Sequence, residues 1–229
     1  MATPSWISFG SVAAGQNALT VAWPGHAIND IGILVIETSG NGTTVNITSP
    51  SGWQAVSGSP VTDLATTAGS KLQVWWKRAT SASEASVTVP DSGDHQIARI
   101  YVFRDCITTG DPWDVTTTGS KTTASTTATL PAVTTTVENT RIVGIVGRPN
   151  DNASTTHFGA PVNTNLSNLF EIQEAGSTAG NGGGFTVITG VKATAGNTGT
   201  TTMTKAASTT DTYMVIALKG ERTRYVLVT

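Results

Sequence analysis

The residues that could carry chemistry in this chain are few and lie far apart in the sequence. Three histidines, His26, His95 and His157, fall in different predicted turns, without the close spacing by which one element presents two metal ligands. Cys106 follows a predicted strand end, and its thiol would need a neighbouring base to become a nucleophile. We therefore expect no zinc site, and we interpret Cys106 as a buried or bystander thiol.

Acidic and amide side chains are the next candidates. Residues 90–96 (PDSGDHQ) and 148–154 (RPNDNAS) group oxygen ligands that calcium could use, although such residues more often satisfy their own backbone in turns. Glycosidase chemistry needs two carboxylates about 5–10 Å apart. The candidates are scattered, and the sequence pairs no two of them: Glu37, Asp63, Glu84, Glu138, Glu171 and Glu174. We expect no catalytic site, no metal and no cofactor.

The composition favours an all-β protein without a nucleic-acid or membrane partner. Of the 229 residues 38% are apolar, enough for a core, and only 12% are charged. Threonine is abundant and suits pleated strands, while 24 glycines with Asn and Ser supply turns. The net charge is -2 and the basic residues are scattered, which disfavours phosphate binding. No apolar run is long enough for a transmembrane helix, and no signal peptide is visible at the N-terminus.

Hydrophobic periodicity indicates strands throughout. No window shows the 3.6-residue period of a helix, and short apolar or alternating runs recur between Gly, Pro, Asn and Ser clusters. In the first half these runs cover 18–23, 31–37, 71–76, 85–89 and 97–103. In the second half they cover 127–133, 141–147, 168–174, 184–191, 200–204 and 212–218.

The two sets of strands form an internal repeat. A shift of about 115 residues sets 77–89 on 192–204 and 98–105 on 213–220, and a shift near 110 pairs 29–36 with 139–146. We interpret this as one β-unit used twice. Its copies cover about 17–105 and 127–220, with a linker at 116–126.

The repeat leaves two architectures open. One is a pair of independent domains of about 110 residues each. The other is a single domain over residues 10–220. We favour it because a lone unit would leave one apolar face of its sheet exposed to water. We expect a two-sheet antiparallel β-sandwich of jelly-roll type, with extended arms at 1–9 and 221–229.

Trp75 and Trp76 are adjacent in a predicted strand, so their indoles point to opposite faces of the sheet. On the repeat Trp76 matches Val191, which predicts a core position. Trp75 matches Gly190, and a position that can also hold glycine does not need a large side chain to complete the core. We therefore predict that Trp75 makes a contact outside its own unit. Two further tryptophans, which we expect to plug the ends of the sandwich, are Trp53 and Trp113.

Both ends of the chain carry apolar residues outside the repeat. Such ends commonly add a strand to the sheet of a neighbour. We therefore predict self-association, as a homo-oligomer or on a lattice. The candidate interface residues are Trp6, Phe9, Trp75, Arg224, Tyr225 and Leu227.

A series of short motifs runs along the chain in the order AINDIGILVIETSGN, PSGWQAV, VWWKRATSASEASVTV, IYVFRD, DPWDV, TTTVENTRIVGIVG and YMVIALKG. Over about residues 10–220 this order resembles Thr/Gly-rich β-sandwich virion structural proteins of tailed bacteriophages and prophages. Asn29-Asp30 stands where that group usually has Gly-Asp, and residues 221–229 lie outside the pattern.

The resemblance implies a non-enzymatic virion component that binds other virion proteins, either the major capsid protein or tail proteins. We expect a head decoration or cement protein, with a tail or fibre accessory protein as the alternative. A function of a different class is a carbohydrate- or receptor-binding module that contacts a host glycan through Trp75, Trp6 and the Asn/Asp loops. A hydrolase would require two carboxylates meeting in one cleft.

Overall fold

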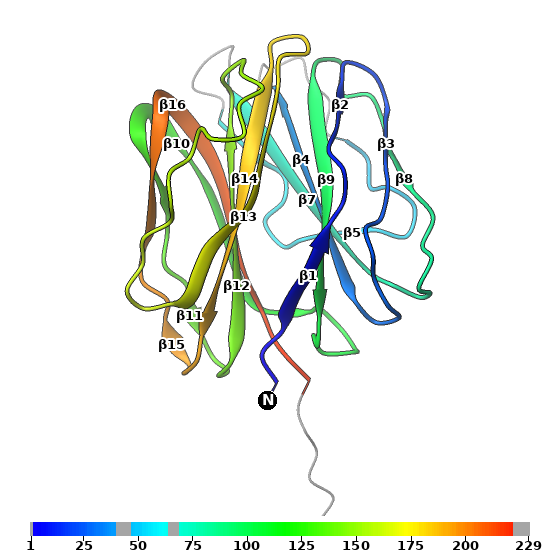
Figure 1. The fold of residues 1–229 in the computed structure, drawn as a ribbon, viewed down its shortest axis with the longest axis vertical. Helices are drawn as coiled ribbons and strands as arrows, with labels where there is room; N and C mark the ends of the chain where they lie inside the picture. The colour runs from blue at the N-terminus through cyan, green and yellow to red at the C-terminus, as the bar shows by residue number, and fades with distance from the viewer. Residues whose placement is uncertain (1, 40–46, 64–68, 222–229) are drawn as a thin grey trace, which may run out of the picture.

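The computed structural model describes residues 2–39, 47–63 and 69–221, and these residues form an all-β, sandwich-like fold. Antiparallel sheets pack face to face and do not close into a barrel (Figure 1). The described residues form no helix, so none is available to cross a membrane. The predicted fold class is confirmed.

The first large sheet has the strand order β1–β9–β4–β7–β5. Its members are β1 (Ser5–Phe9), β9 (Gln96–Arg104), β4 (Ile31–Ser39), β7 (Ser70–Arg78) and β5 (Gln54–Ala55). Two short strands extend it, since β2 (Ala13–Gly15) pairs with β9 and β6 (Val61–Thr62) pairs with β7. A separate ribbon of β3 (Leu19–Val21) and β8 (Val87–Val89) lies at its outer side (Figure 1).

The second large sheet comes from the other half of the chain and has the order β10–β16–β12–β14–β13. Its members are β10 (Trp113–Leu130), β16 (Thr201–Leu218), β12 (Thr140–Arg148), β14 (Gly183–Lys192) and β13 (Ser167–Ser177). A small ribbon of β11 (Thr134–Thr135) and β15 (Gly196–Asn197) lies at one end.

Three apolar layers hold these elements together. The central layer takes residues from both sheets, including Ile33 and Val35 of β4 and Val143 and Ile145 of β12. A second cluster covers the outer face of the first sheet and includes Leu34, and a third covers the outer face of the second sheet. Strands such as β4 are apolar at consecutive positions because both of their faces are buried.

The strand pairing follows the internal repeat. In the first sheet Ile31 of β4 lies opposite Phe103 of β9, and in the second Arg141 of β12 lies opposite Leu218 of β16. The sequence shift of 110 residues relates Ile31 to Arg141, and the shift of 115 residues relates Phe103 to Leu218. The two halves therefore build these strand pairs in the same register.

The repeat alignment was wrong by two residues in β7. Ile33 pairs with Trp76, and its counterpart Val143 pairs with Thr189, so the counterpart of Trp76 is Thr189 and not Val191. A shift of two residues keeps every side chain on its own face, so apolar alternation cannot detect it. The core position predicted for Trp76 is nevertheless confirmed, because it is 6% exposed in the central layer.

The same correction changes the interpretation of Trp75. Leu34 pairs with Trp75, and its counterpart Gly144 pairs with Ile188, so Trp75 corresponds to Ile188 and not to Gly190. Ile188 is buried in the third apolar cluster. Trp75 therefore occupies a slot that the second half also fills with an apolar side chain.

Two predicted boundaries were wrong. Residues 116–126 are no linker, because they lie within β10, whose residues Thr116–Lys121 pair with β16. The β-branched threonines suit a strand, but an edge strand that is only half-buried lacks the apolar alternation that marks one. Residues 5–9 likewise are no free arm, because they form β1 and pair with β9.

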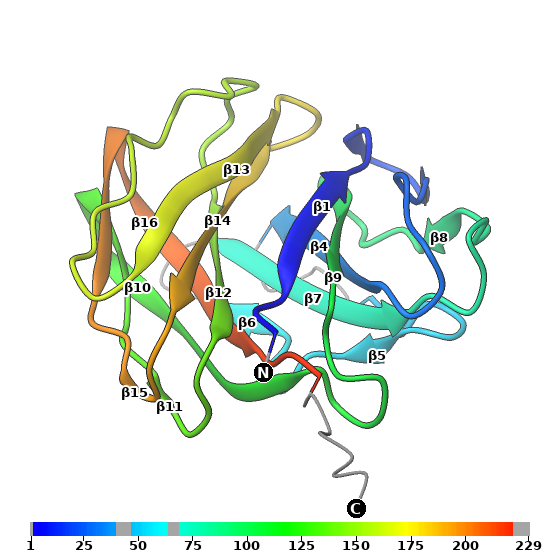
Figure 2. The same ribbon diagram turned by 60° about the horizontal axis from the view of Figure 1, so that its bottom comes forward.

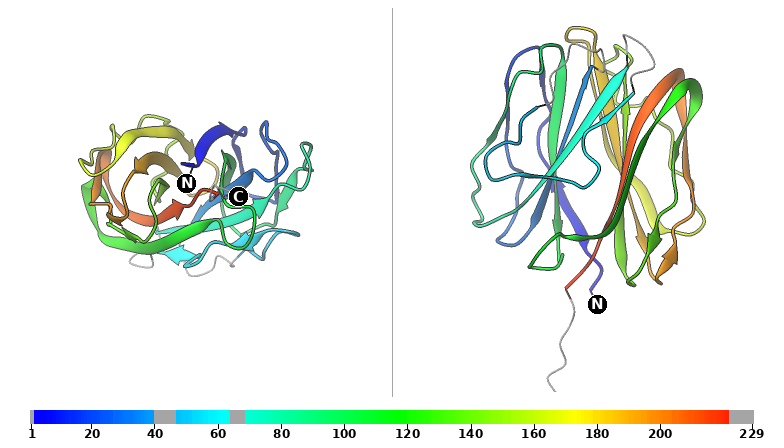
Figure 3. Two further views of the ribbon diagram at one scale, coloured as in Figure 1. Left: turned by 90° about the horizontal axis from the view of Figure 1, so that it is seen from below. Right: turned by 180° about the vertical axis from the view of Figure 1, so that it is seen from behind.

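The first and last described residues lie together at one end of the molecule (Figure 2). Gly220 contacts the backbone of Ala2 so closely that a Cβ at Gly220 would collide with it. Arg141 of the second sheet donates a hydrogen bond from Nε to the Pro4 carbonyl at 2.7 Å. Seen from this end, the two sheets curve away on either side of the first and last described residues (Figure 3).

Candidate functional site

The predicted interface residues Trp6 and Phe9 lie at a seam between the two sheets. β1 and β13 are terminal strands of their sheet paths, and the Trp6 ring contacts Phe170 of β13 edge-on with 6.0 Å between centroids. Trp6 is half-buried against the central layer and stacks on Phe9. Phe9 and Phe170 are 37% and 38% exposed. The structure thus gathers three aromatic residues there, and their role as an interface stays a prediction.

The other predicted interface residues lie apart from this seam. Trp75 is half-buried and packs against the second apolar cluster. Arg224, Tyr225 and Leu227 lie outside the described residues. The expected plugs Trp53 and Trp113 are confirmed as buried, at 5% and 9% exposure, in the second cluster and the central layer.

Cys106 is a buried thiol, as predicted. It is 3% exposed, and burial raises its pKa to about 12. A thiol with so high a pKa is protonated at neutral pH and is a poor nucleophile.

The sequence did not reveal a buried polar cluster between the sheets. Glu37, near the end of β4, lies with one carboxylate oxygen 3.2 Å from His95 Nε2, and the other accepts a hydrogen bond from Ser70 Oγ at 2.9 Å. The Ser70 hydroxyl lies 3.2 Å from the Thr212 hydroxyl of β16, in the other sheet. The cluster therefore connects the two sheets through side chains from four separate stretches of the chain.

Close approach of the second sheet encloses this cluster. A Cβ at Gly183 of β14 would collide with both the Glu37 carboxylate and the His95 ring. Glu37 and Ser70 have no exposed surface, and His95 is 1% exposed. Substrate therefore cannot reach these groups in this conformation, although serine, histidine and a carboxylate occur together.

Burial and mutual charge shift the protonation of the pair. Burial raises the pKa of Glu37 to about 7, against the lowering effect of the His95 hydrogen bond. Burial lowers the pKa of His95, but the hydrogen bond and charge of Glu37, together with Asp94, outweigh it and raise the pKa. The two groups interact directly and therefore titrate as a coupled unit.

The Asn-rich loop that could have bound calcium is organised instead by Arg148. This fully buried guanidinium donates to the backbone carbonyls of Asn150, Asn152 and Ser154 at 3.0–3.1 Å. Glu174 lies 3.4 Å from it. In the other candidate loop, the Asp91 carboxylate accepts a hydrogen bond from the backbone of Gly93. No cluster of metal-binding side chains occurs among the described residues.

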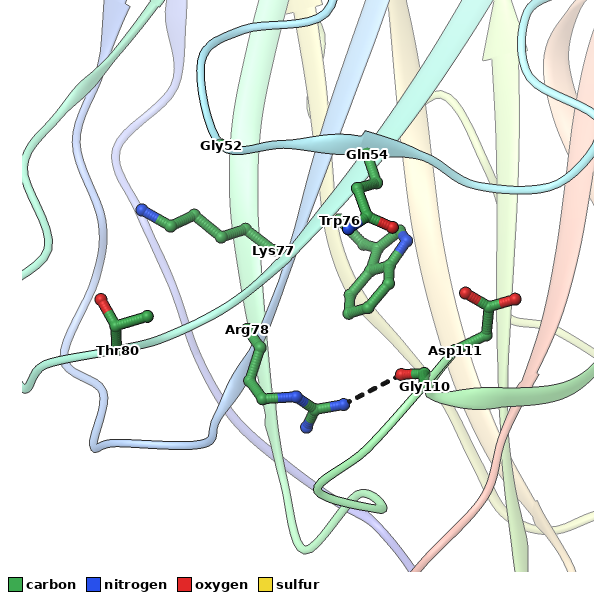
Figure 4. A pocket seen from close by; sticks show the side chains of 8 residues that line it. All are labelled: Gly52, Gln54, Trp76, Lys77, Arg78, Thr80, Gly110 and Asp111. Carbon is green, nitrogen blue, oxygen red and sulfur yellow. Dashed lines mark hydrogen bonds between the residues drawn. The ribbon is translucent and has the colours of Figure 1, made fainter.

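An open groove of about 480 Å³ lies where β7 ends, between β5 and the loop that leads to β10 (Figure 4). Its lining is Gly52, Gln54, Trp76, Lys77, Arg78, Thr80, Gly110 and Asp111. In Figure 4 the side chains of Gln54 and Trp76 lie one above the other, with Arg78 and Asp111 below, while Lys77 points away from them. Polar and apolar surface contribute about equally to this lining.

The groove is built by neighbouring strand positions. Trp76 points inward and packs edge-on against Trp113, with 5.5 Å between centroids. The Arg78 guanidinium lies 5.9 Å from the Trp76 ring centroid and donates to the Gly110 carbonyl at 3.2 Å. Lys77, between them in the sequence, points to the other face and pairs with Glu84. The VWWKR motif was therefore the feature of the sequence that could have indicated this groove. Which of its side chains line the groove depends on the packing of the strands and loops around it.

Comparisons with protein-family models, with curated proteins and with solved structures found no match to this chain. The class of protein that the structure defines is therefore an all-β protein of sandwich-like fold.

Proposed function

We propose that this chain is a non-enzymatic structural component of a tailed-phage virion, and specifically a head decoration or cement protein. The observation that carries the proposal is the order of sequence motifs, which resembles that of such virion proteins over about residues 10–220. In the fold these motifs form central elements: VWWKR lies in β7, IYVFR in β9, and YMVIAL in β16.

The arrangement of the body supports the proposal. The central apolar layer and a buried polar cluster connect the two sheets, and two further apolar layers cover their outer faces, which suits a part that must hold its shape on a particle. The seam formed by Trp6, Phe9 and Phe170 offers exposed aromatic rings beside two terminal strands. Aromatic side chains are enriched at protein interfaces, and terminal strands can pair with a neighbour.

Quantitative mass spectrometry of purified particles tests the proposal. We expect the chain in virions at a copy number in fixed ratio to the major capsid protein. A few copies per particle would instead indicate the alternative role, a tail or fibre accessory protein. Its absence from particles that are otherwise complete would overturn both.

A further inference from the structure

Lys205 and Asp211 form an ion pair that is enclosed within the protein. The Lys205 Nζ lies 2.7 Å from Asp211 Oδ1, and the exposed fractions of the two side chains are 0% and 2%. Both residues belong to β16, and 6 positions separate them. The ladder between β10 and β16 is interrupted at residues 205–208, and this bulge lets the two side chains of one strand meet.

The two partners differ in how well their hydrogen bonds are satisfied. The Lys205 ammonium donates to the backbone carbonyl and the hydroxyl of Thr209, at 2.7 and 3.0 Å, as well as to Asp211. Asp211 Oδ2 is buried and has no hydrogen-bond partner among the described residues. A buried charge that lacks part of its hydrogen bonds is costly. An amide between the two side chains removes this cost, because it is neutral and keeps only one of the two carboxylate oxygens.

Burial also shifts the protonation of both groups towards their neutral forms. It lowers the pKa of Lys205 by more than the hydrogen bond and charge of Asp211 raise it. It raises the pKa of Asp211 to about 6, against the lowering effect of Lys205. Proton transfer from the ammonium to the carboxylate is therefore easier here than between exposed groups. It leaves an amine lone pair beside a carboxylic acid, and these are the two reactants of an amide bond.

Another lysine–carboxylate contact in the same protein lacks these properties. Lys77 is 23% exposed, and its partner Glu84 also accepts hydrogen bonds from the backbone and the hydroxyl of Thr80. Burial raises the pKa of Glu84, but the hydrogen bonds from Lys77 and Thr80 outweigh it and lower the pKa to about 2. The Glu84 carboxylate therefore stays charged and resists attack by a nucleophile. Burial and hydrogen bonding, and not contact alone, distinguish the two pairs.

We propose that Lys205 and Asp211 join in the folded protein by an isopeptide bond between their side chains. The Lys205 ammonium transfers one proton to the Asp211 carboxylate, and the resulting amine attacks Asp211 Cγ. A C–N bond forms and one C–O bond breaks. The oxygen leaves as water, with the proton that it received and a second proton from the nitrogen. Every atom comes from the pair, so the step needs no co-reactant.

Asp63 is the group to which we assign the transfer of the second proton. It is completely buried, and its charge acts on Asp211. The fold supplies the rest by holding amine and carboxyl in contact, because proximity replaces a bimolecular encounter with an intramolecular one. The bond closes the bulge of β16 covalently. It goes beyond the proposed virion role and does not depend on it, since both reacting groups belong to this chain.

Peptide mapping of the full chain tests the bond. Trypsin cleaves after lysine, so an unlinked chain yields residues 193–205 and 206–219 as separate peptides. We expect the folded protein, incubated at neutral pH and then denatured for digestion, to yield 193–219 as one peptide that is lighter than its sequence by one water molecule. Fragmentation should locate this loss at Lys205 and Asp211.

Lys205→Arg is the variant that removes the bond, because it keeps the positive charge and a trypsin site while a guanidinium does not form the amide. It should lose the linked peptide completely. Lys192→Arg is the matched control and should retain it, and thermal unfolding should show that each variant is folded. Cleavage after Lys77 in the same digest should be complete.

Three results would overturn the proposal. They are complete cleavage after Lys205 in the folded parent protein after prolonged incubation, a water loss that persists in Lys205→Arg, and equal linking in a chain kept in urea, where the two side chains are not held together. Asp63→Asn should slow the linking, and an unchanged rate would overturn the role of Asp63. None of these outcomes bears on the virion role, which the composition of particles tests separately.

Discussion

Glu37 and His95 face each other inside the sandwich, with 3.2 Å between the carboxylate Oε2 and the ring Nε2, although 58 positions separate them in the chain. Both side chains are almost completely buried, and Ser70 connects the carboxylate to Thr212 of the opposite sheet. The two sheets therefore share a titratable contact in addition to their apolar core.

We predict that this pair makes the protein less stable as the pH rises through neutrality. The folded pKa of Glu37, about 7, exceeds its ordinary value of 4.5, so the folded state binds more protons between these values and loses that stability as the pH rises. The raised pKa of His95 acts in the same direction above pH 6.5. Glu37→Gln should remove a change on the order of 2 kcal/mol in the unfolding free energy between pH 5 and 8.

Urea unfolding at a series of pH values measures this change. Asp91→Asn serves as the control, because it neutralises an exposed carboxylate while an amide oxygen can still accept the Gly93 hydrogen bond. A pH profile of Glu37→Gln that matches the parent protein would contradict the assignment.

We predict that His157 has the opposite effect on stability, and makes the protein less stable as the pH falls into the acid range. Its ring is 2% exposed, and neither ring nitrogen has a hydrogen-bond partner among the described residues. Burial, together with the charges of Arg148 and Lys205, lowers its pKa to about 4. The neutral ring is therefore favoured in the folded state, and stability falls as the pH drops from 6.5 towards 4.

His157→Leu should remove this acid sensitivity, on the order of 2 kcal/mol, because leucine fills the site without a proton to bind. Thermal unfolding at pH 4, 5 and 7 checks it. His26→Gln is the comparison, since His26 is half-buried and contacts Pro24 and Glu84 through its ring nitrogens. If both variants change the acid response equally, burial of His157 is not its cause.

The tandem tryptophans should differ in their contribution to stability. Trp76→Ala removes a buried ring from the central layer and should cost about 3–5 kcal/mol of unfolding free energy. Trp75→Ala should cost less, about 1–2 kcal/mol, because that ring is only half-buried against the second cluster. Chemical denaturation of the two variants separates the positions, and a Trp75→Ala protein of unchanged stability would restore its interpretation as a contact made only with a partner.

Self-association should depend on the aromatic seam. Phe9→Ser combined with Phe170→Ser removes the exposed rings while leaving β1 and β13 in place, and should shift the protein towards monomer in sedimentation velocity. Ile28→Ser is the control, because Ile28 is a 59% exposed apolar residue that lines a different hollow together with Arg104 and Asp105. A parent protein that is monomeric at every concentration tested, or an equal effect of Ile28→Ser, would contradict the prediction that the aromatic seam mediates self-association. Deletion of residues 1–9 is a less informative test, since it removes β1 from its sheet.

Local pattern was sufficient for several features of this protein. Runs rich in apolar residues at 31–37 and 97–103 predicted strands, and the repeat placed two strand pairs in equivalent registers. Alternation also placed Trp76 in the core. These features depend on side-chain period and on composition, which are properties of short segments.

Other features came only from the tertiary structure. The true counterpart of Trp75 is Ile188, because strands can slide by two residues without changing which face a side chain occupies. The greater part of β10, residues 113–126, was not predicted, because a threonine-rich edge strand shows little apolar alternation. The Glu37–His95 pair and the Arg78 groove depend on contacts between segments that are distant in sequence. Sequence alone thus determined most of the strands and their repetition. The packing of segments that are distant in the chain decided which polar groups come into contact, because no short stretch of sequence records those distances.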